Sequence, residues 1–250
     1  MFHFLCAPTK SEASRLAADL AIDLLKNKPD AVLGLATGSS PLDFYADLAE
    51  ACRSGEISFA KVRSVNLDEY VGLRPDHDQS YAYFMRENLF SRVDILPENT
   101  HLPSGTAKDL DGECKAYHEL LLSVGRPDLQ VLGIGNNGHI GFNEPSDAFP
   151  ENTAVVTLTE STIRANSRFF ASEDEVPKQA ISMGVGEILR AEKILLLAFG
   201  SAKAAILEQA LFGEVTPRVP ASILQTAAEV YVCADDEAMA VIREKHGNIA

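Results

Sequence analysis

Short apolar runs alternate with amphipathic segments along the whole chain. Short, mostly apolar runs are typical of strands buried in a sheet, whereas apolar positions three or four residues apart are typical of helices. The pattern predicts strands at residues 2–6, 31–35, 61–67, 129–134, 154–158, 178–183, 193–199 and 229–233. It predicts helices at residues 11–28, 41–53, 79–90, 109–124, 160–170, 185–190, 200–212 and 235–244.

The order of these elements indicates an α/β fold. Alternating strands and helices form a mostly parallel sheet with helices on both faces and right-handed crossovers. The length of 250 residues is ordinary for one domain, so we expect a single domain over residues 1–250. Pro and Asn recur in residues 142–170, which makes this segment the candidate lid over a site.

The charge and the cysteines narrow the class of protein. With 22 Lys and Arg against 36 Asp and Glu, the net charge is −14, which argues against nucleic acid or an anionic membrane as partner. No apolar run approaches the ~20 residues of a membrane-spanning helix. The four cysteines form no Cys-x-x-Cys pair, so we expect buried free thiols in a cytoplasmic protein.

The most informative stretch is VLGIGNNGHIGFNEP at residues 131–145. Its glycines allow the chain to leave a buried strand in a tight turn, and that turn carries His139 and Glu144 among several amides. Ligands of open α/β sheets bind just past the carboxyl ends of strands. Such a loop can also merely satisfy its own backbone, but a base and a carboxylate together favour a site.

A second cluster has the residues of a phosphate-binding turn. Thr37, Gly38, Ser39 and Ser40 follow a predicted strand and precede Pro41, which suits a helix start. Backbone N–H groups at such a helix N-terminus attract anions. The motif alone is weak, because Ser before Pro is also a common helix cap.

Further polar residues follow other predicted strands. Asp68 and Glu69 end one strand; two acids there form either a solvated turn or, if one points inward, a positioned base. Lys203 lies in the first turn of a helix, where its charge opposes the helix dipole unless an anion is bound. Arg168 stands beside two phenylalanines, on which it could simply pack. Four polar clusters fall at the carboxyl edge of the predicted sheet, at residues 37–40, 68–70, 136–144 and 200–203.

The residues by themselves indicate acid/base chemistry on a phosphorylated small molecule. No trio of His and carboxylates has metal-ligand spacing, and the turn before Pro41 lacks the lysine of a nucleotide-binding P-loop. The Gly-x-Gly-x-x-Gly pattern at residues 133–138 leads into no evident helix, so it is weak support for a dinucleotide. We expect neither a metal nor a cofactor.

Five motifs resemble the glucosamine-6-phosphate deaminase family in order and spacing. They are ATGSSP, NLDEYVGL, GNNGHIGFNEP, ANSRFF and GSAKA, and they extend over nearly the whole chain. NLDEY combined with GHIGFNEP is specific to that family, whereas the glycine turns are not. The resemblance implies a modified doubly wound, Rossmann-like sheet.

The resemblance also implies a reaction, the conversion of D-glucosamine 6-phosphate and water to D-fructose 6-phosphate and ammonia in N-acetylglucosamine catabolism. The enzyme would be an isomerase and, because water releases the amino group, also a hydrolase. His139, oriented by Glu144, would open the sugar ring, and Asp68 would move the C2 proton to C1. The phosphate would bind Thr37, Gly38, Ser39 and Ser40, with Lys203 and Arg168 completing the clamp.

Two departures from the family pattern carry expectations. Asn137 stands where many members have an aspartate of the ring-opening group, so we expect ring opening with a different pH profile. Allosteric hexameric members have basic side chains at the positions of Ala154 and Val156, neither of which can pair with phosphate. We therefore expect a non-allosteric enzyme and a monomer.

Two other functions compete with this interpretation. 6-Phosphogluconolactonases share the fold and a similar Gly-rich turn, but a different run follows their histidine. A non-catalytic sugar-phosphate sensor would need a DNA-binding extension. We do not expect one, because the N-terminus leaves no room for it and is not basic. Asp68, His139 and Glu144 are all present, which favours an enzyme.

Overall fold

A seven-stranded parallel sheet forms the centre of the computed structural model, which describes residues 1–247. Its strands are β1 (Phe2–Ala7), β2 (Val32–Leu35), β3 (Arg63–Asn66), β5 (Thr100–His101), β6 (Leu129–Gly133), β9 (Lys193–Ala198) and β10 (Val230–Asp235). They are ordered β1-β10-β9-β6-β2-β3-β5. The predicted α/β fold with a mostly parallel, Rossmann-like sheet is confirmed.

Helices pack around this sheet. They are α1 (Lys10–Asn27), α2 (Leu42–Arg53), α3 (Tyr81–Asn88), α4 (Leu110–Val124), α5 (Glu160–Asn166), α6 (Val185–Ile188), α7 (Ala204–Phe212) and α8 (Ala240–His246). α1 begins at Lys10, one residue before the predicted start, because Thr9 caps it in a capping box with Glu12. None of these helices is long and apolar enough to cross a membrane, within residues 1–247.

A second, smaller sheet was not predicted. It is antiparallel and contains β4 (Asp68–Tyr70), β8 (Gln179–Ser182) and β7 (Ala154–Thr157), in that order. The chain leaves the main sheet after β3 and enters β4 at Asp68, opposite Ser182. Placing residues 154–158 and 178–183 in the parallel sheet was therefore wrong, because a short apolar run has the same pattern in either sheet.

Other boundaries also differ from the prediction. The helix predicted to Phe170 is α-helical only to Asn166 and continues as a 3₁₀ helix over Ser167–Phe169. β5 is too short for its pattern to be noticed. The four cysteines are free, as expected, but Cys6 and Cys52 are only half-buried.

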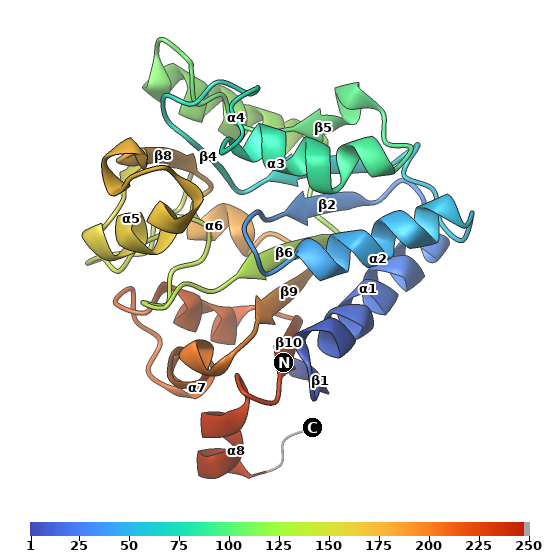
Figure 1. The fold of residues 1–250 in the computed structure, drawn as a ribbon, viewed down its shortest axis with the longest axis vertical. Helices are drawn as coiled ribbons and strands as arrows, with labels where there is room; N and C mark the ends of the chain where they lie inside the picture. Colours follow the sequence, from blue (N-terminus) through green and yellow to red (C-terminus); the bar gives the residue numbers. More distant parts are fainter. Residues whose placement is uncertain (248–250) are drawn as a thin grey trace.

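The sheet has a switch point between β2 and β6. From β2 the chain continues to β3 and β5, whereas from β6 it continues to β9 and β10 on the other side. The two connections diverge and leave a crevice past the carboxyl ends of the strands, where open α/β sheets bind ligands. In Figure 1 the arrows of β2, β6 and β9 point toward α5 and β8, so the small sheet lies near this crevice.

Candidate functional site

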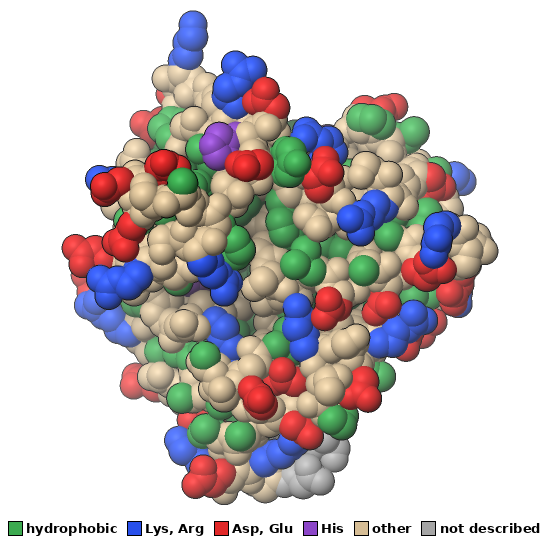
Figure 2. Space-filling model, in the orientation of Figure 1, with side chains coloured by type: hydrophobic (Ala, Val, Ile, Leu, Met, Phe, Trp, Pro, Cys, Tyr) green, Lys and Arg blue, Asp and Glu red, His purple; other side chains and the backbone are tan. Residues whose placement is uncertain are grey.

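A cavity of about 840 Å³ occupies the crevice at the switch point. Nine of the ten predicted site residues line it, namely Thr37, Gly38, Ser39, Ser40, Asp68, Asn137, His139, Arg168 and Lys203. The tenth, Glu144, lies behind His139. Figure 2 shows this face of the molecule, with Lys and Arg side chains gathered around a hollow near its centre.

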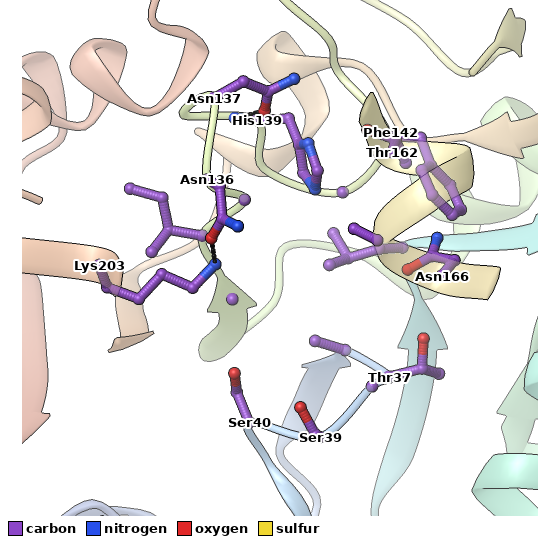
Figure 3. Close-up of a pocket in the computed structure, with 18 of the residues that line it drawn as sticks. Thr37, Ser39, Ser40, Asn136, Asn137, His139, Phe142, Thr162, Asn166 and Lys203 are labelled. Atoms are coloured by element: carbon purple, nitrogen blue, oxygen red, sulfur yellow. Dashed lines mark hydrogen bonds between the residues drawn. The ribbon is translucent and has the colours of Figure 1, made fainter. Parts of the chain in front are cut away.

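The loop between β2 and α2 forms one wall. Gly38 has a φ of +93°, a conformation that residues with a Cβ rarely adopt, and it lets the loop turn sharply after the strand. Thr37, Ser39 and Ser40 then lie side by side along the cavity in Figure 3. Pro41 is the N-cap of α2 rather than a residue of its first turn. The loop thus directs hydroxyls and the N-terminus of α2 to the cavity.

Two cations on the cavity wall have neutral partners. Lys203 Nζ donates to Asn136 Oδ1 at 2.6 Å, and Arg168 Nη2 donates to Ser39 Oγ at 3.4 Å. The Arg168 guanidinium also lies 4.6 Å from the ring centroid of Phe169, as packing on an aromatic predicts. Neither cation forms an ion pair within the described residues. Burial and the charge of Arg168 lower the pKa of Lys203, a shift that a bound anion would oppose.

Asp68 presents a buried carboxyl group to the cavity. It is 6 % exposed, and its side chain makes no hydrogen bond within residues 1–247. Burial, with the charge of Glu69 as a smaller contribution, raises its pKa to about 8. A carboxyl group with a pKa near neutrality is suited both to accept and to return a proton.

The neighbouring Glu69 has a structural role. Adjacent residues of a strand point to opposite faces, and Glu69 points toward α3. Its carboxylate accepts hydrogen bonds from the backbone N–H groups of Tyr70, Tyr81 and Ala82, at 2.8 to 2.9 Å. It therefore anchors the N-terminus of α3, and Asp68 is the acid that faces the cavity.

The position of His139 depends on two glycines. A Cβ on Gly135 would lie 2.3 Å from the imidazole ring, so only glycine leaves room for the ring at this point. Gly138 has a φ of +86°, a conformation that closes the turn between Gly135 and His139. As Figure 3 shows, the ring extends from this turn into the cavity.

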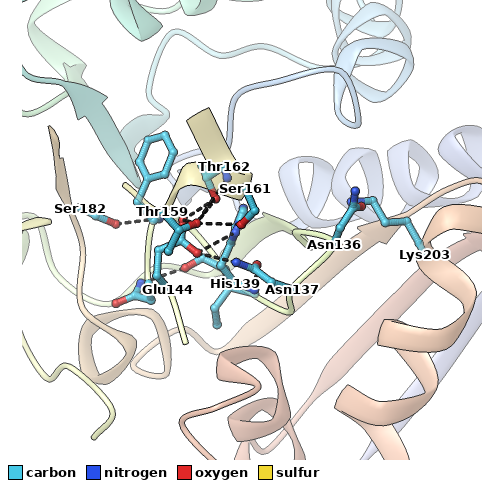
Figure 4. A network of polar contacts seen from close by, with 12 residues as sticks. Asn136, Asn137, His139, Glu144, Thr159, Ser161, Thr162, Ser182 and Lys203 are labelled. Atoms are coloured by element: carbon cyan, nitrogen blue, oxygen red, sulfur yellow. Dashed lines mark hydrogen bonds and ion pairs between the residues drawn. The ribbon is translucent and has the colours of Figure 1, made fainter. Parts of the chain in front are cut away.

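Glu144 is the centre of a polar network behind His139 (Figure 4). Its Oε2 accepts a hydrogen bond from Asn137 Nδ2 at 2.6 Å and lies 3.5 Å from His139 Nδ1. Its Oε1 accepts from the hydroxyls of Thr159 and Thr162. Burial would raise the pKa of Glu144, but the contact with His139 and the hydrogen bonds from Thr162 and Asn137 outweigh it and lower the pKa to about 2. This carboxylate therefore stays ionised beside the imidazole.

Several lining residues were missed by the sequence reasoning. They are Lys10, Tyr81, Phe142, Ser161, Thr162 and Asn166. Lys10 starts the helix after the first strand, so the parallel topology could have placed it at the same edge. Thr162 and Asn166 are four residues apart on α5 and so share a face, but only the tertiary fold shows that this face meets the cavity.

No group of three or more His, Cys, Asp or Glu side chains that could hold a metal ion occurs in residues 1–247.

Comparisons with known proteins agree with the geometry. The sequence profile of the family described as glucosamine-6-phosphate isomerases/6-phosphogluconolactonase matches residues 9–232. A glucosamine-6-phosphate deaminase from Lachnoclostridium phytofermentans is 54 % identical over 226 residues, 90 % of this chain and 96 % of the relative. A solved monomeric glucosamine-6-phosphate deaminase superposes with a TM-score of 0.93 at 44 % identity, covering 95 % of this chain and 99 % of the other.

The lactonases are more distant. A 6-phosphogluconolactonase from Thermotoga maritima superposes with a TM-score of 0.75 at 20 % identity, covering 94 % of this chain and 99 % of the other. At that identity the similarity concerns the fold alone.

Proposed function

The chain belongs to the family of glucosamine-6-phosphate isomerases and 6-phosphogluconolactonases, and we propose that it is an enzyme that converts D-glucosamine 6-phosphate and water to D-fructose 6-phosphate and ammonia. The reaction belongs to the breakdown of amino sugars. One observation carries the proposal: the carboxyl group of Asp68 and the imidazole of His139 line the same cavity as the loop of residues 37–40 and two cations. Proton transfer and phosphate binding thus meet within one space.

Ring opening is assigned to His139. The imidazole lines the cavity, and Glu144 behind it is ionised and held by three hydrogen bonds. With Oε2 3.5 Å from Nδ1, this carboxylate would orient the ring and stabilise the imidazolium that forms when the other nitrogen takes a proton. His139 would thereby carry a proton between O1 and O5 of the sugar.

Proton transfer between carbons is assigned to Asp68. When ionised it would take the C2 proton of the open-chain sugar and return it at C1, through a cis-enolamine. The same group must accept and then release the proton, and the raised pKa of about 8 suits both steps. Water then releases the amino group as ammonia.

The phosphate would be held at the other wall. The hydroxyls of Thr37, Ser39 and Ser40, the backbone of Gly38 and the N-terminus of α2 offer hydrogen bonds, and Lys203 and Arg168 offer charge. Binding the remote phosphate positions C2 beside the base, which lowers the entropic part of the barrier.

We infer a single catalytic domain in which residues 142–170 act as the lid. They include Glu144, Thr162 and Arg168, so movement of this segment would change the ring-opening network and the phosphate clamp together. Closure would exclude water during proton transfer.

We also infer that the protein is cytoplasmic and monomeric. The free cysteines support a cytoplasmic location. A monomer without allosteric activation is supported by the similarity to a monomeric deaminase and by Ala154 and Val156, which lack the charge to bind an activating phosphate.

The test is a two-product assay. The purified protein is incubated with glucosamine 6-phosphate, and ammonia and fructose 6-phosphate are measured together beside the Asp68→Asn variant. Equal release of both products, lost in the variant, is expected. Binding of the sugar phosphate without either product would refute the enzymatic proposal and favour a sensor.

A further inference from the structure

We propose that Lys10 is a third cation of the phosphate site and binds the substrate phosphate directly. The inference rests on the proposed phosphate site and extends it to a residue that no motif indicates. Lys10 is the first residue of α1, and its side chain lines the same cavity as Ser39 and Lys203.

The contacts of Lys10 place its ammonium group at the phosphate loop. Nζ donates to the backbone carbonyl of Ser39 at 2.9 Å and lies 5.8 Å from the ring centroid of Phe199, which also lines the cavity. Phe199 follows β9 and leads into Gly200 and Lys203. The ammonium group therefore lies between the loop after β2 and the segment after β9, the two places from which phosphate-binding groups come.

The hydrogen-bonding capacity of Lys10 is not exhausted by these contacts. A lysine ammonium group has three donors, and Nζ makes one hydrogen bond within the described residues. Its acidic neighbour is Asp43, whose Oδ2 lies 3.6 Å away, and both side chains are partly exposed, at 35 % and 42 %. An exposed pair at this distance is weak, so the ammonium group can turn to a ligand at little cost.

The charged side chains that line the cavity are mostly cations. In a chain with a net charge of −14, Lys10, Arg168 and Lys203 all line this one cavity. Lys10 and Arg168 meet at the same residue, the first at the carbonyl of Ser39 and the second at its hydroxyl. A phosphate monoester carries up to two negative charges near neutral pH, so it would balance Arg168 and Lys203, whose partners are neutral, and Lys10, whose ion pair with Asp43 is weak.

The test uses inorganic phosphate as the probe, with glucosamine 6-phosphate as substrate. Four variants are compared with the wild-type protein: Lys10→Met, Lys10→Arg, Arg168→Met and the control Lys26→Met. Lys26 is on the same helix, is exposed and pairs with Glu56, so the control removes the same charge and a similar ion pair far from the cavity. Melting temperatures are measured for all variants.

We expect Lys10→Met to raise KM and the inhibition constant of phosphate together, by about five- to tenfold, because a charge-assisted hydrogen bond is lost. The kcat should change less than about twofold, since a phosphate contact is the same in the substrate and the transition state. Lys10→Arg should restore most of the affinity. Lys26→Met should behave as the wild type.

A fifth variant keeps the inference falsifiable if Lys10→Met is poorly folded. Asp43→Asn removes the charge that competes for Lys10, so phosphate should inhibit it more tightly, by about twofold. Unchanged inhibition in this variant would contradict the inference. If Lys10→Met matches Lys26→Met while Arg168→Met weakens inhibition, the role of Lys10 is refuted and the phosphate site stands. If Arg168→Met also leaves inhibition unchanged, the phosphate site itself is wrong.

Discussion

Replacing Asp68 with asparagine should abolish the activity and yet stabilise the protein. The carboxyl group is buried and makes no hydrogen bond within the described residues, so the folded protein resists its ionisation. Asparagine has nearly the same shape and no charge. Burying the carboxyl group of Asp68 therefore lowers the free energy of unfolding in a pH-dependent way, and the variant should regain this stability.

The magnitude follows from the pKa of Asp68, which is raised from 3.8 to about 8. The shift of roughly 4 units corresponds to ~6 kcal/mol at 1.36 kcal/mol per unit, an upper limit. Relaxation and water entering the open cavity lower the cost, so we expect about 3 kcal/mol.

The direction of the pH dependence follows from the number of protons bound by the folded and the unfolded chain. Below about pH 4 the carboxyl group is protonated in both the folded and the unfolded chain, so its contribution to stability is fully present. As the pH rises, the unfolded chain loses its proton first, and the wild-type free energy of unfolding falls until the folded pKa of about 8 is passed. The advantage of Asp68→Asn should therefore grow between pH 4 and 8 and then level off.

The assay is denaturant unfolding of both proteins at half-unit pH steps, with kcat/KM measured over the same range. Asp23→Asn, which removes an exposed aspartate of α1, is the matched control. The acidic limb of the wild-type kcat/KM profile should follow the same pKa, because the free enzyme needs an ionised base. A variant that is less stable than the wild type at pH 8, or a difference that does not vary with pH, would refute the reasoning.

Three further predictions follow from the network and from β7. Asn137→Asp brings a second carboxylate next to Glu144, because Asn137 Nδ2 now lies 2.6 Å from Glu144 Oε2. One of the two carboxylates must then hold a proton, so the pH profile of kcat/KM should shift. Identical profiles for the variant and the wild type would contradict this. Thr162→Val removes a hydroxyl donor from the buried, charged carboxylate of Glu144. The free energy of unfolding should fall by about 1.5–3 kcal/mol, and kcat should fall as well. A change in KM alone would show that Thr162 does not act through Glu144. N-acetylglucosamine 6-phosphate should not activate the enzyme, since Ala154 and Val156 offer no charge, and a reproducible rate increase would disprove it.

Much of the fold and of the site follows from local sequence. The alternation of apolar runs and amphipathic segments predicts a parallel α/β sheet, and residues that end strands of such a sheet must share one edge. That argument placed Thr37, Asp68, His139 and Lys203 together without any coordinates, and the structure confirms that all four line one cavity. Chain chirality and glycine conformation act within a few residues, which is why they can be recognised in the sequence.

Only the tertiary structure decided which sheet a strand joins and which way a side chain points. β7 and β8 have the apolar pattern of central strands, but β8 pairs with β4 and β7 pairs with β8, because the chain leaves the main sheet at Asp68. Asp68 and Glu69 are equivalent in sequence; the fold turns one into the cavity and the other onto the N-terminus of α3. Strand pairing and burial depend on contacts between residues far apart in the chain, and the same long-range packing brings Lys10 to Ser39.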